Sequence, residues 1–328
     1  MKHEITEEKN KKIKIWQIIL IIFLLIIIGL ISYAGFFIWA KLSKINYESI
    51  DKSDLDINEN LYDEVSNNIS KKEFDDIKTI ALFGTDSRDV NNMYAGRSDT
   101  IIIASINPKN KSIKLISIPR DTYVNIPGRG MDKINHAYAF GKEQLSIKTI
   151  NNNFGLNISE YITIDFSGLI YIIDSIGGVE LNITEAEKNY INSGVSKKVS
   201  SSGKVTLNGE QALQHSRNRT VGNDFARASR QRDVLEAIIN KLSNKNMSEI
   251  SRFCDIFLPQ VKTNMNVTSY LDDVAVALTQ KDSYLKNIFS VQIPSLNYSK
   301  GQMINGVYYF TTDINKAKGD FIEYIYNK

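Results

Sequence analysis

The 328-residue sequence is poor in the residues that most often build disulfides and zinc sites. Its single cysteine, Cys254, excludes an intramolecular disulfide. Of its three histidines, His3 lies in the N-terminal tail, and His136 and His215 show no metal-ligand spacing. We therefore expect no zinc site, and we expect Cys254, His136 and His215 to be structural or loop residues.

The sequence also lacks an excess of charge of either sign. Its 40 lysines and arginines and 37 acidic residues leave a formal net charge of +3. This balance is far from that of a polybasic protein, so nucleic acid is not indicated as a partner, and any anion site must come from local clustering. Hydrophobic residues make up 42% of the chain, which is enough for a folded domain with a real core.

One long apolar run, residues 15–40, contains no charged side chain. A run of this length can cross a hydrocarbon layer of ~30 Å. Trp16 and Trp39 lie near its ends, where indole rings favour the membrane interface. Five lysines precede it and predict a cytoplasmic N-terminus: Lys2, Lys9, Lys11, Lys12 and Lys14. We expect an uncleaved signal anchor, because the alternative, a cleaved signal peptide, normally has a shorter apolar region and a small-residue cleavage site.

The anchor divides the chain into four parts. Residues 1–14 form a basic cytoplasmic tail, 15–40 the transmembrane anchor, 41–76 a polar spacer and 77–328 an extracytoplasmic domain of a single-pass cell-membrane protein. The spacer is acidic and shows little apolar periodicity, so we expect weak order there. Residues 246–328 alternate short strand and helix signals and should complete the same domain without a motif that carries chemistry.

Three apolar, β-branched runs predict core strands at residues 79–84, 100–107 and 112–119. The turn between the second and third is short enough to force an antiparallel hairpin, and the first strand can join them as a meander. The end of the first strand, the start of the second and the end of the third then lie at one sheet edge. Acidic residues and arginines gather at that edge: Asp86, Arg88, Arg97, Asp99, Arg120 and Asp121.

Such a gathering suits a phosphate site. Two carboxylates can hold a hard divalent cation, and arginines bind phosphate oxygens bidentately. Each loop alone has a simpler interpretation, because an acid and an arginine in a loop usually form a solvated ion pair that contributes little. The expected convergence of the loops is what favours a site.

A second basic cluster lies on a predicted helix. Asn208 is expected to open a short helix, and Asp224 can cap a longer one. At about 100° per residue, Arg227 and Gln231 project within the apolar stripe of the longer helix. A core-facing cation needs either a buried carboxylate or an anionic ligand, and local sequence does not separate the two. Three nearby arginines favour a phosphate: Arg217, Arg219 and Arg230.

On this interpretation, Arg120 and Arg227 are excess cations and not halves of internal ion pairs.

The segment between the two clusters sets the fold class. Residues 161–166 and 179–183 predict strands, and residues 169–176 predict an apolar helix ended by two glycines. We expect an α/β fold with α-β-α layers, in which a mixed central sheet carries helices on both faces after one transmembrane helix. The apolar helix is either core or the wall of a lipid groove.

Six ordered motifs stand behind the predicted anchor: GTDSR, GRSDTIII, SIPRDTYVNIP, DKINHAYA, LNGEQALQHSRNR and NDFARASRQR. Together they resemble the LytR-CpsA-Psr family, densely over residues 78–242. Two departures are small, because Asn223 stands where a glycine is usual and His215 where an aromatic residue is usual. The resemblance implies an enzyme that moves a glycan polymer, such as teichoic acid, capsule or a related polysaccharide, from an undecaprenyl-pyrophosphate carrier to a muramic acid hydroxyl of peptidoglycan, forming a phosphodiester.

The resemblance also implies roles for individual residues. Two carboxylates would bind magnesium, with manganese as the alternative: Asp86 and Asp99. Three arginines would clamp the pyrophosphate oxygens: Arg120, Arg219 and Arg227. Two acids would orient these arginines, or accept the acceptor's proton: Asp121 and Asp224. The remaining pocket residues would be Arg88, Arg97, Arg217, Arg230, Gln231 and, at the rim, Lys133.

Two other functions would use a similar site. A lipid pyrophosphate hydrolase would take water as the acceptor, and a non-enzymatic wall-precursor binding protein would keep its ligand after loss of Asp86 and Asp99. A purely structural anchor does not explain a core-facing Arg227. The transferase is favoured, because phosphoryl transfer asks a protein mainly for positioning and charge neutralisation around oxygen atoms.

Overall fold

The computed structural model describes residues 40, 43–86, 96–222, 224–266, 269 and 279–327. The chain divides into two compact units, Met1–Lys44 and Ile45–Lys328, and the second is described below. The predicted membrane anchor, residues 15–40, lies outside the described residues except for Ala40. Within the described ranges, no helix combines the length and the apolar character that a membrane crossing requires.

A mixed β-sheet of seven strands, counted over the described residues, forms the centre of the second unit. Its order is β1 (Asn46–Tyr47), β10 (Val261–Thr263), β7 (Glu160–Asp165), β2 (Lys78–Thr85), β3 (Ser98–Asn107), β4 (Ser112–Ser117) and β11 (Ile288–Gln292). β2, β3 and β4 pair antiparallel in chain order, which confirms the predicted meander. β7 and β11 pair parallel with β2 and β4, so the sheet is mixed as predicted.

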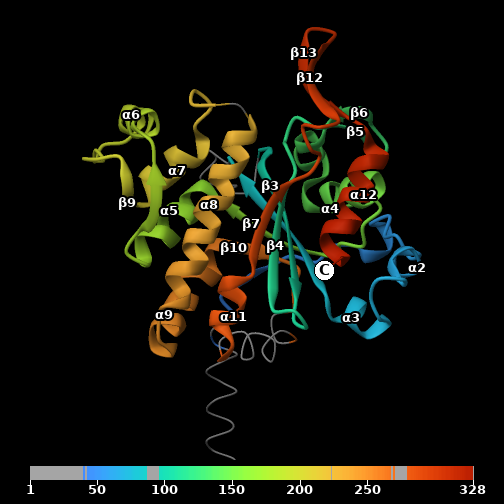
Figure 1. Cartoon of the computed structure of the whole chain (residues 1–328), viewed down its shortest axis with the longest axis horizontal. Helices are drawn as coiled ribbons and strands as arrows, with labels where there is room; N and C mark the ends of the chain where they lie inside the picture. The colour runs from blue at the N-terminus through green and yellow to red at the C-terminus, as the bar shows by residue number, and fades with distance from the viewer. Residues whose placement is uncertain are drawn as a thin grey trace, which may run out of the picture. The chain divides into compact units, whose positions relative to one another are not determined.

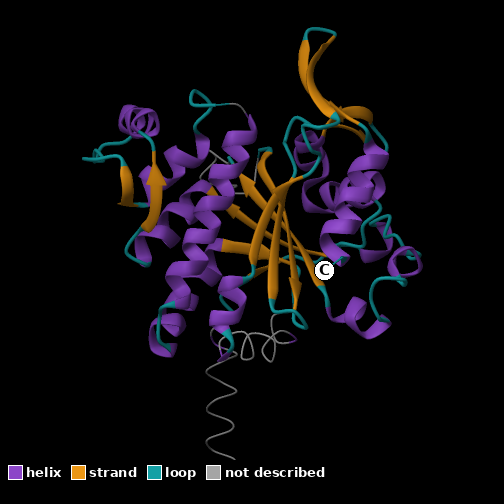
Figure 2. Ribbon diagram, in the orientation of Figure 1, coloured by secondary structure: helices purple, strands orange, loops and turns teal. Residues whose placement is uncertain are grey.

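Both faces of the sheet are buried, as the apolar strands require. Along β3, Ile101 and Ile103 belong to one hydrophobic cluster, and Ile102 and Ala104 belong to another. Successive side chains of a strand point to opposite faces, so each face needs its own cover. Figure 2 shows the sheet between two layers of helices, which confirms the α/β class with helices on both faces.

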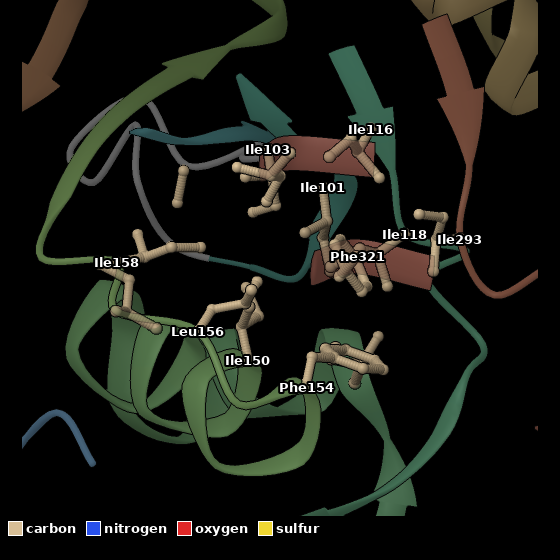
Figure 3. Close-up of a cluster of buried hydrophobic side chains, with 14 of the residues drawn as sticks. Ile101, Ile103, Ile116, Ile118, Ile150, Phe154, Leu156, Ile158, Ile293 and Phe321 are labelled. Carbon is tan, nitrogen blue, oxygen red and sulfur yellow. The ribbon is translucent and has the colours of Figure 1, made fainter. Parts of the chain in front are cut away.

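The larger core lies on the face covered by α4 (Ile134–Phe154) and α12 (Ile314–Tyr326). Figure 3 shows the isoleucines of β3 and β4 packed towards Ile150 and Phe154 of α4 and Phe321 of α12. The rings of Phe154 and Phe321 are tilted against each other, with centroids 4.9 Å apart. These residues are fully buried, and a large-to-small substitution of such a side chain typically costs several kcal/mol.

The predicted weak order of the polar spacer is wrong for its described part. That part contains η1 (Lys52–Asp54), α2 (Leu61–Val65) and α3 (Lys71–Asp76). Leu55, Leu61 and Val65 are fully buried in the larger core. Burial of these widely spaced apolar side chains orders the segment, although acidic neighbours hide their periodicity in the sequence.

The opposite face is covered by α5 (Phe166–Ser175) and α8 (Asp224–Ser243). Figure 1 shows α5, α7 (Gly209–Arg217), α8 and α9 (Met247–Phe257) on the side of the sheet away from α4 and α12. The predicted strand at residues 179–183 is β8 (Val179–Ile183), but it pairs with β9 (Gly203–Leu207) in a separate small sheet. Beside this sheet, α6 (Glu185–Gly194) completes a second core.

Two hairpins extend the domain beyond the edge of the sheet where the candidate site residues lie. One joins β5 (Tyr123–Ile126) to β6 (Gly130–Lys133), and the other joins β12 (Ser299–Ile304) to β13 (Val307–Thr312). The backbone N–H of Phe310 donates to the carbonyl oxygen of Asp121 at 2.8 Å, which fixes the base of the second hairpin. Its tip projects from the domain (Figure 1). The C-terminal segment also contains η2 (Leu258–Gln260) and α11 (Lys281–Lys286).

Candidate functional site

The predicted convergence of charged residues at one sheet edge is confirmed for its described members. Thr85 at the end of β2 pairs with Ser98 at the start of β3. The N–H of Ile118, just after β4, donates to the carbonyl oxygen of Ile101. The residues next to these strand ends therefore lie at the same edge of the sheet: Asp86, Arg97, Asp99 and Arg120. Arg88 lies outside the described residues.

A cleft of about 560 Å³ opens at this edge. Residues from the ends of β3 and β4 line one side, and residues from the first turns of α8 line another. The predicted site residues that it brings together are Asp99, Arg120, Asp121, Lys133, Arg219, Arg227 and Gln231. Most of the predicted pocket thus meets in one cavity, although its members are distant in sequence.

Asp99 lies between two arginines in this cleft. The Nη1 of Arg120 donates to its Oδ1 at 2.6 Å, and the Nη2 of Arg227 lies 3.5 Å from its Oδ2. Arg227 also donates to the backbone carbonyl oxygen of Asp99 at 3.2 Å. The prediction that Arg120 and Arg227 are not halves of internal ion pairs is therefore wrong. They share one carboxylate, which lowers the cost of burying Arg227.

The cleft still carries an excess of positive charge. Four cationic side chains of the described residues line it, against two carboxylates, Asp99 and Asp121. Burial alone would raise the pKa of Asp99, but the guanidinium groups of Arg120, Arg227 and Arg219 outweigh it and hold this pKa below its ordinary value. Asp99 is therefore ionised at neutral pH, and two positive charges remain for an anion.

Asp121 has the geometry of an orienting carboxylate. Its Oδ1 lies 2.7 Å from the Nζ of Lys133, and its Oδ2 lies 3.5 Å from the Nε of Arg120. Asp121 is buried, and its two partners, Arg120 and Lys133, both line the cleft. The other predicted acid, Asp224, begins α8, but its side chain lies outside the described part of the structure.

A second, apolar cavity of about 270 Å³ adjoins the cleft. Apolar side chains of β2, β3, β7, α5 and α8 line most of it, and Arg227 and Gln231 line both cavities. Leu169 and Ile172 of α5 face this cavity, whereas Ile173 and Ile176 belong to the second core. The apolar helix was expected to be either core or the wall of a groove, and it is both. One side packs in the second core and the other lines the apolar cavity.

Not every predicted pocket residue reaches the cleft. Arg217 is exposed and lines the apolar cavity, with its guanidinium 5.0 Å from the ring centroid of Phe166. Arg97 is exposed and Asp86 is half-buried, and neither belongs to the described lining of the cleft. The missing Cβ of Gly96 would lie 3.0 Å from the Oδ1 of Asp86, so this glycine leaves room beside that carboxylate.

Arg230 does not line either cavity, contrary to the expectation that it completes the pocket. Its Nη1 lies 3.2 Å from the Oε1 of Glu187 on α6, and its Nη2 donates to the carbonyl oxygen of Asn218 at 2.6 Å. The side chain of Asn218 accepts hydrogen bonds from the N–H groups of Thr220 and Val221. Arg230 thus holds the turn that carries Arg219.

One wall of the cleft was not predicted from the sequence. Four residues of the C-terminal segment line it: Leu296, Gly301, Tyr308 and Phe310. Phe310 forms a bridge with Thr122 and packs edge-on against Phe225 of α8, with ring centroids 5.0 Å apart. The short strand signal of residues 307–312 was visible in the sequence, but pairing across so long a separation has no local signature.

The profile of the LytR_cpsA_psr family matches residues 41–320. The chain belongs to the LytR-CpsA-Psr family. This confirms the resemblance carried by the six motifs.

Relatives in this family have named activities. TagU of Bacillus subtilis, a polyisoprenyl-teichoic acid–peptidoglycan teichoic acid transferase, is 34% identical over 313 residues, which cover 94% of each chain. TagT of the same species has the same activity name and is 33% identical over 254 residues, covering 75% of this chain and 76% of TagT. The predicted enzyme class, a glycopolymer–peptidoglycan transferase, is confirmed by these relatives.

Solved structures agree on the fold. TagT bound to LI-WTA superimposes with a TM-score of 0.61 at 28% identity, covering 77% of this chain and 92% of that chain. TagT with bound octaprenyl pyrophosphate lipid gives a TM-score of 0.57 at 26% identity, covering 76% and 90%.

Proposed function

We propose that this chain transfers a glycan phosphate polymer from an undecaprenyl-pyrophosphate carrier to a muramic acid hydroxyl of peptidoglycan. The observation that carries the proposal is the pair of adjoining cavities, one cationic and one apolar, that share Arg227 and Gln231. A polyprenyl pyrophosphate has the same division, with a polyanionic head joined to an apolar tail. The lipid bound to TagT belongs to this chemical class.

The pyrophosphate head would occupy the cleft. Arg120, Arg219 and Arg227 can donate to its oxygens, because guanidinium groups bind phosphate in forked, charge-assisted pairs. Asp99 holds Arg120 and Arg227 in place before the ligand arrives, and Asp121 does the same for Lys133. Such preorganised charge is the main contribution that a protein makes to phosphoryl transfer.

The tail would enter the apolar cavity beside α5 and α8. Burial of hydrocarbon there is favourable by roughly 25 cal/mol per Å² of apolar surface removed from water. Arg227 lies where the two cavities meet, so it is placed to contact the phosphate next to the first isoprene unit. This position explains why an arginine occupies the apolar stripe of α8.

In the transfer, the acceptor hydroxyl oxygen attacks the phosphorus that carries the glycan. A new P–O bond forms, the bond from that phosphorus to the bridging oxygen breaks, and polyprenyl phosphate leaves with the electron pair. The hydroxyl proton passes to a general base. Both oxygens of Asp121 face cations, so Asp121 suits positioning better than proton transfer, and Asp224 remains the sequence candidate for the base.

The donor set at the edge fits magnesium. Asp86 and Asp99 are hard oxygen ligands on neighbouring strand ends, and Gly96 leaves space beside Asp86. The described residues contain no group of three or more His, Cys, Asp or Glu side chains that could hold a metal ion. Mg²⁺ commonly binds through one or two carboxylates together with substrate phosphates. When bound, it would add positive charge next to the pyrophosphate, with manganese as the alternative ion.

Residues 15–40 complete the proposal as a signal anchor in the cytoplasmic membrane, with the domain outside. A lipid-linked donor is embedded in that membrane, so an anchored enzyme meets it at the surface. The wall polymers that fit this scheme are teichoic acids, capsule and related polysaccharides.

The proposal is tested with the full chain in detergent, a labelled polyprenyl-pyrophosphate-linked saccharide and uncrosslinked peptidoglycan. We expect label to join the peptidoglycan through a phosphodiester, with release of one polyprenyl phosphate per transfer. Release of soluble glycan phosphate that does not depend on peptidoglycan would identify a hydrolase. Donor binding without turnover would identify a binding protein.

A variant tests the apolar cavity separately. Leu169→Trp fills part of the cavity, so the KM for the lipid donor should rise while binding of inorganic pyrophosphate stays unchanged. Tyr171→Trp on the same helix is the matched control, because Tyr171 is 54% exposed and does not line the cavity.

A further inference from the structure

One wall of the cleft comes from the C-terminal segment. β13 forms part of this wall, with Tyr308 and Phe310 lining the cleft. Tyr309 lies between them in the strand and therefore points to the opposite side. There its ring lies 4.6 Å from the ring centroid of Tyr123 on β5. β13 thus separates the cleft from a second surface at the base of the two hairpins.

Lys133 joins the cleft to this second surface. It lines the cleft, and its Nζ lies 2.7 Å from the Oδ1 of Asp121. The same Nζ lies 5.7 Å from the ring centroid of Tyr309. A ligand that crosses the rim at Lys133 therefore passes directly from the phosphate-binding residues to the tyrosine pair.

Beyond Lys133 the surface alternates polar and aromatic groups. The Oη of Tyr309 lies 3.5 Å from the Oδ1 of Asp132, and the Oδ2 of Asp132 lies 2.8 Å from the Nδ1 of His136. Phe140 follows one helical turn later, edge-on to His136, and is 44% exposed. The guanidinium of Arg129 lies over the Phe140 ring at 4.0 Å. We name this contiguous set, Arg129, Asp132, His136, Phe140 and Tyr309, the rim surface.

We propose that the rim surface binds the glycan strand of the acceptor. This inference rests on the proposed function and adds the place where the acceptor docks. The donor's head and tail occupy the cleft and the apolar cavity, so the attacking hydroxyl must approach across the remaining rim. Sugar rings present an apolar face and a hydroxyl-bearing edge. The rim surface offers the exposed ring of Phe140 and the half-buried ring of Tyr309 beside a carboxylate and an imidazole.

A glycan fits this surface better than a membrane does. Surfaces that lie on lipid combine a continuous apolar face with lysines and arginines, whereas the centre of the rim surface is the carboxylate of Asp132. The location of the rim surface, away from the end at which the chain enters the domain, also favours a glycan over a membrane. The chain enters the domain at β1, which contacts η2 directly after α9. In Figure 1, α9 and α11 lie at the opposite end of the domain from the β12–β13 hairpin.

The experiment uses the full chain in detergent and measures two quantities in Tyr309→Ala and Phe140→Ala. The first is binding of uncrosslinked peptidoglycan glycan fragments in the absence of donor. The second is transfer, with acceptor and donor titrated separately. We expect glycan affinity to fall and the acceptor KM to rise, each by about fivefold to tenfold, as loss of an aromatic contact predicts, while the donor KM stays unchanged.

Two controls keep the test specific. Tyr171→Ala removes an exposed tyrosine on α5, away from the rim surface. Its glycan affinity, acceptor KM and donor KM should equal those of the protein without a substitution. Tyr309→Phe keeps the ring against Tyr123 and should retain most of the affinity. An unchanged donor KM in Tyr309→Ala separates loss of the ring from a folding defect, because a misfolded variant would lose the donor site as well.

Unchanged glycan binding in both alanine variants would overturn the inference, as would a rise in donor KM without a change in acceptor KM. Loss of binding to phosphatidylglycerol vesicles, with glycan binding intact, would assign the surface to lipid and also overturn it. Glycan binding is measured without donor, so failure of the proposed transfer reaction leaves this test readable.

Discussion

Arg120 and Arg227, which lie on different sides of the cleft, share the carboxylate of Asp99, at 2.6 Å and 3.5 Å from its two oxygens. This arrangement explains how two guanidinium groups can stand side by side before any anion binds. Because like charges repel, the carboxylate of Asp99 helps to hold the two guanidinium groups close together.

Substituting either arginine is expected to abolish most activity. Arg227→Ala or Arg120→Ala removes charge-assisted hydrogen bonds to the pyrophosphate and should lower kcat/KM at least about 100-fold. The fold should persist, because Asp99 retains the other arginine as a partner. Steady-state kinetics and thermal unfolding measure the two effects. Arg252→Ala, an exposed arginine on α9, is the matched control, and normal turnover in either cleft variant would remove these arginines from the site.

Removal of magnesium should stop transfer. If Asp86 and Asp99 hold the ion, Asp86→Asn should raise the magnesium concentration for half-maximal rate at least about tenfold, because an amide is a much weaker ligand for a hard cation. Asp99→Asn should do the same and should also weaken the positioning of Arg120. Titration of magnesium into chelator-treated protein measures this. An undiminished rate in excess chelator would refute the metal proposal but not the arginine cleft.

Arg230 should matter through Arg219. Arg230→Ala leaves the buried Glu187 without its cation and frees the turn at Asn218, so the free energy of unfolding should fall by about 3 kcal/mol. Transfer should also slow at least about tenfold. A double-mutant cycle separates positioning from stability, because Arg219→Ala should cost much less in the Arg230→Ala background. Additive effects of the two substitutions would show that Arg230 acts on stability alone.

His215 should make the domain sensitive to acid. Burial lowers its pKa from 6.5 to about 4, with the nearby Glu187 opposing this shift and the Arg230 cation adding to it. Between these values the unfolded chain binds a proton that the folded chain does not, so stability rises with pH through this window and is lost on acidification.

His215→Phe should remove that contribution. Thermal unfolding at several pH values should show a smaller loss of Tm between pH 6.5 and 4 in the variant than in the unchanged protein. Above pH 6.5 the difference between the two proteins should be constant, because His215 is neutral in both folded and unfolded states. Parallel profiles across the whole range would contradict this account.

The sequence by itself determined the strand meander and the placement of charge at its edge. A short turn forces β3 and β4 into a hairpin, and the alternation of side chains in strands is a local property. The orientation of Arg227 followed from helical periodicity for the same reason, since 100° per residue relates it to the apolar stripe of its own helix.

Only the tertiary structure decided what each face meets. The sharing of Asp99, the contact of Arg230 with Glu187, the burial of Leu55 and Leu61, and the wall formed by Tyr308 and Phe310 all join segments far apart in the chain. Periodicity indicates which side of an element is buried but not its partner, because the partner is selected by the packing of the whole core.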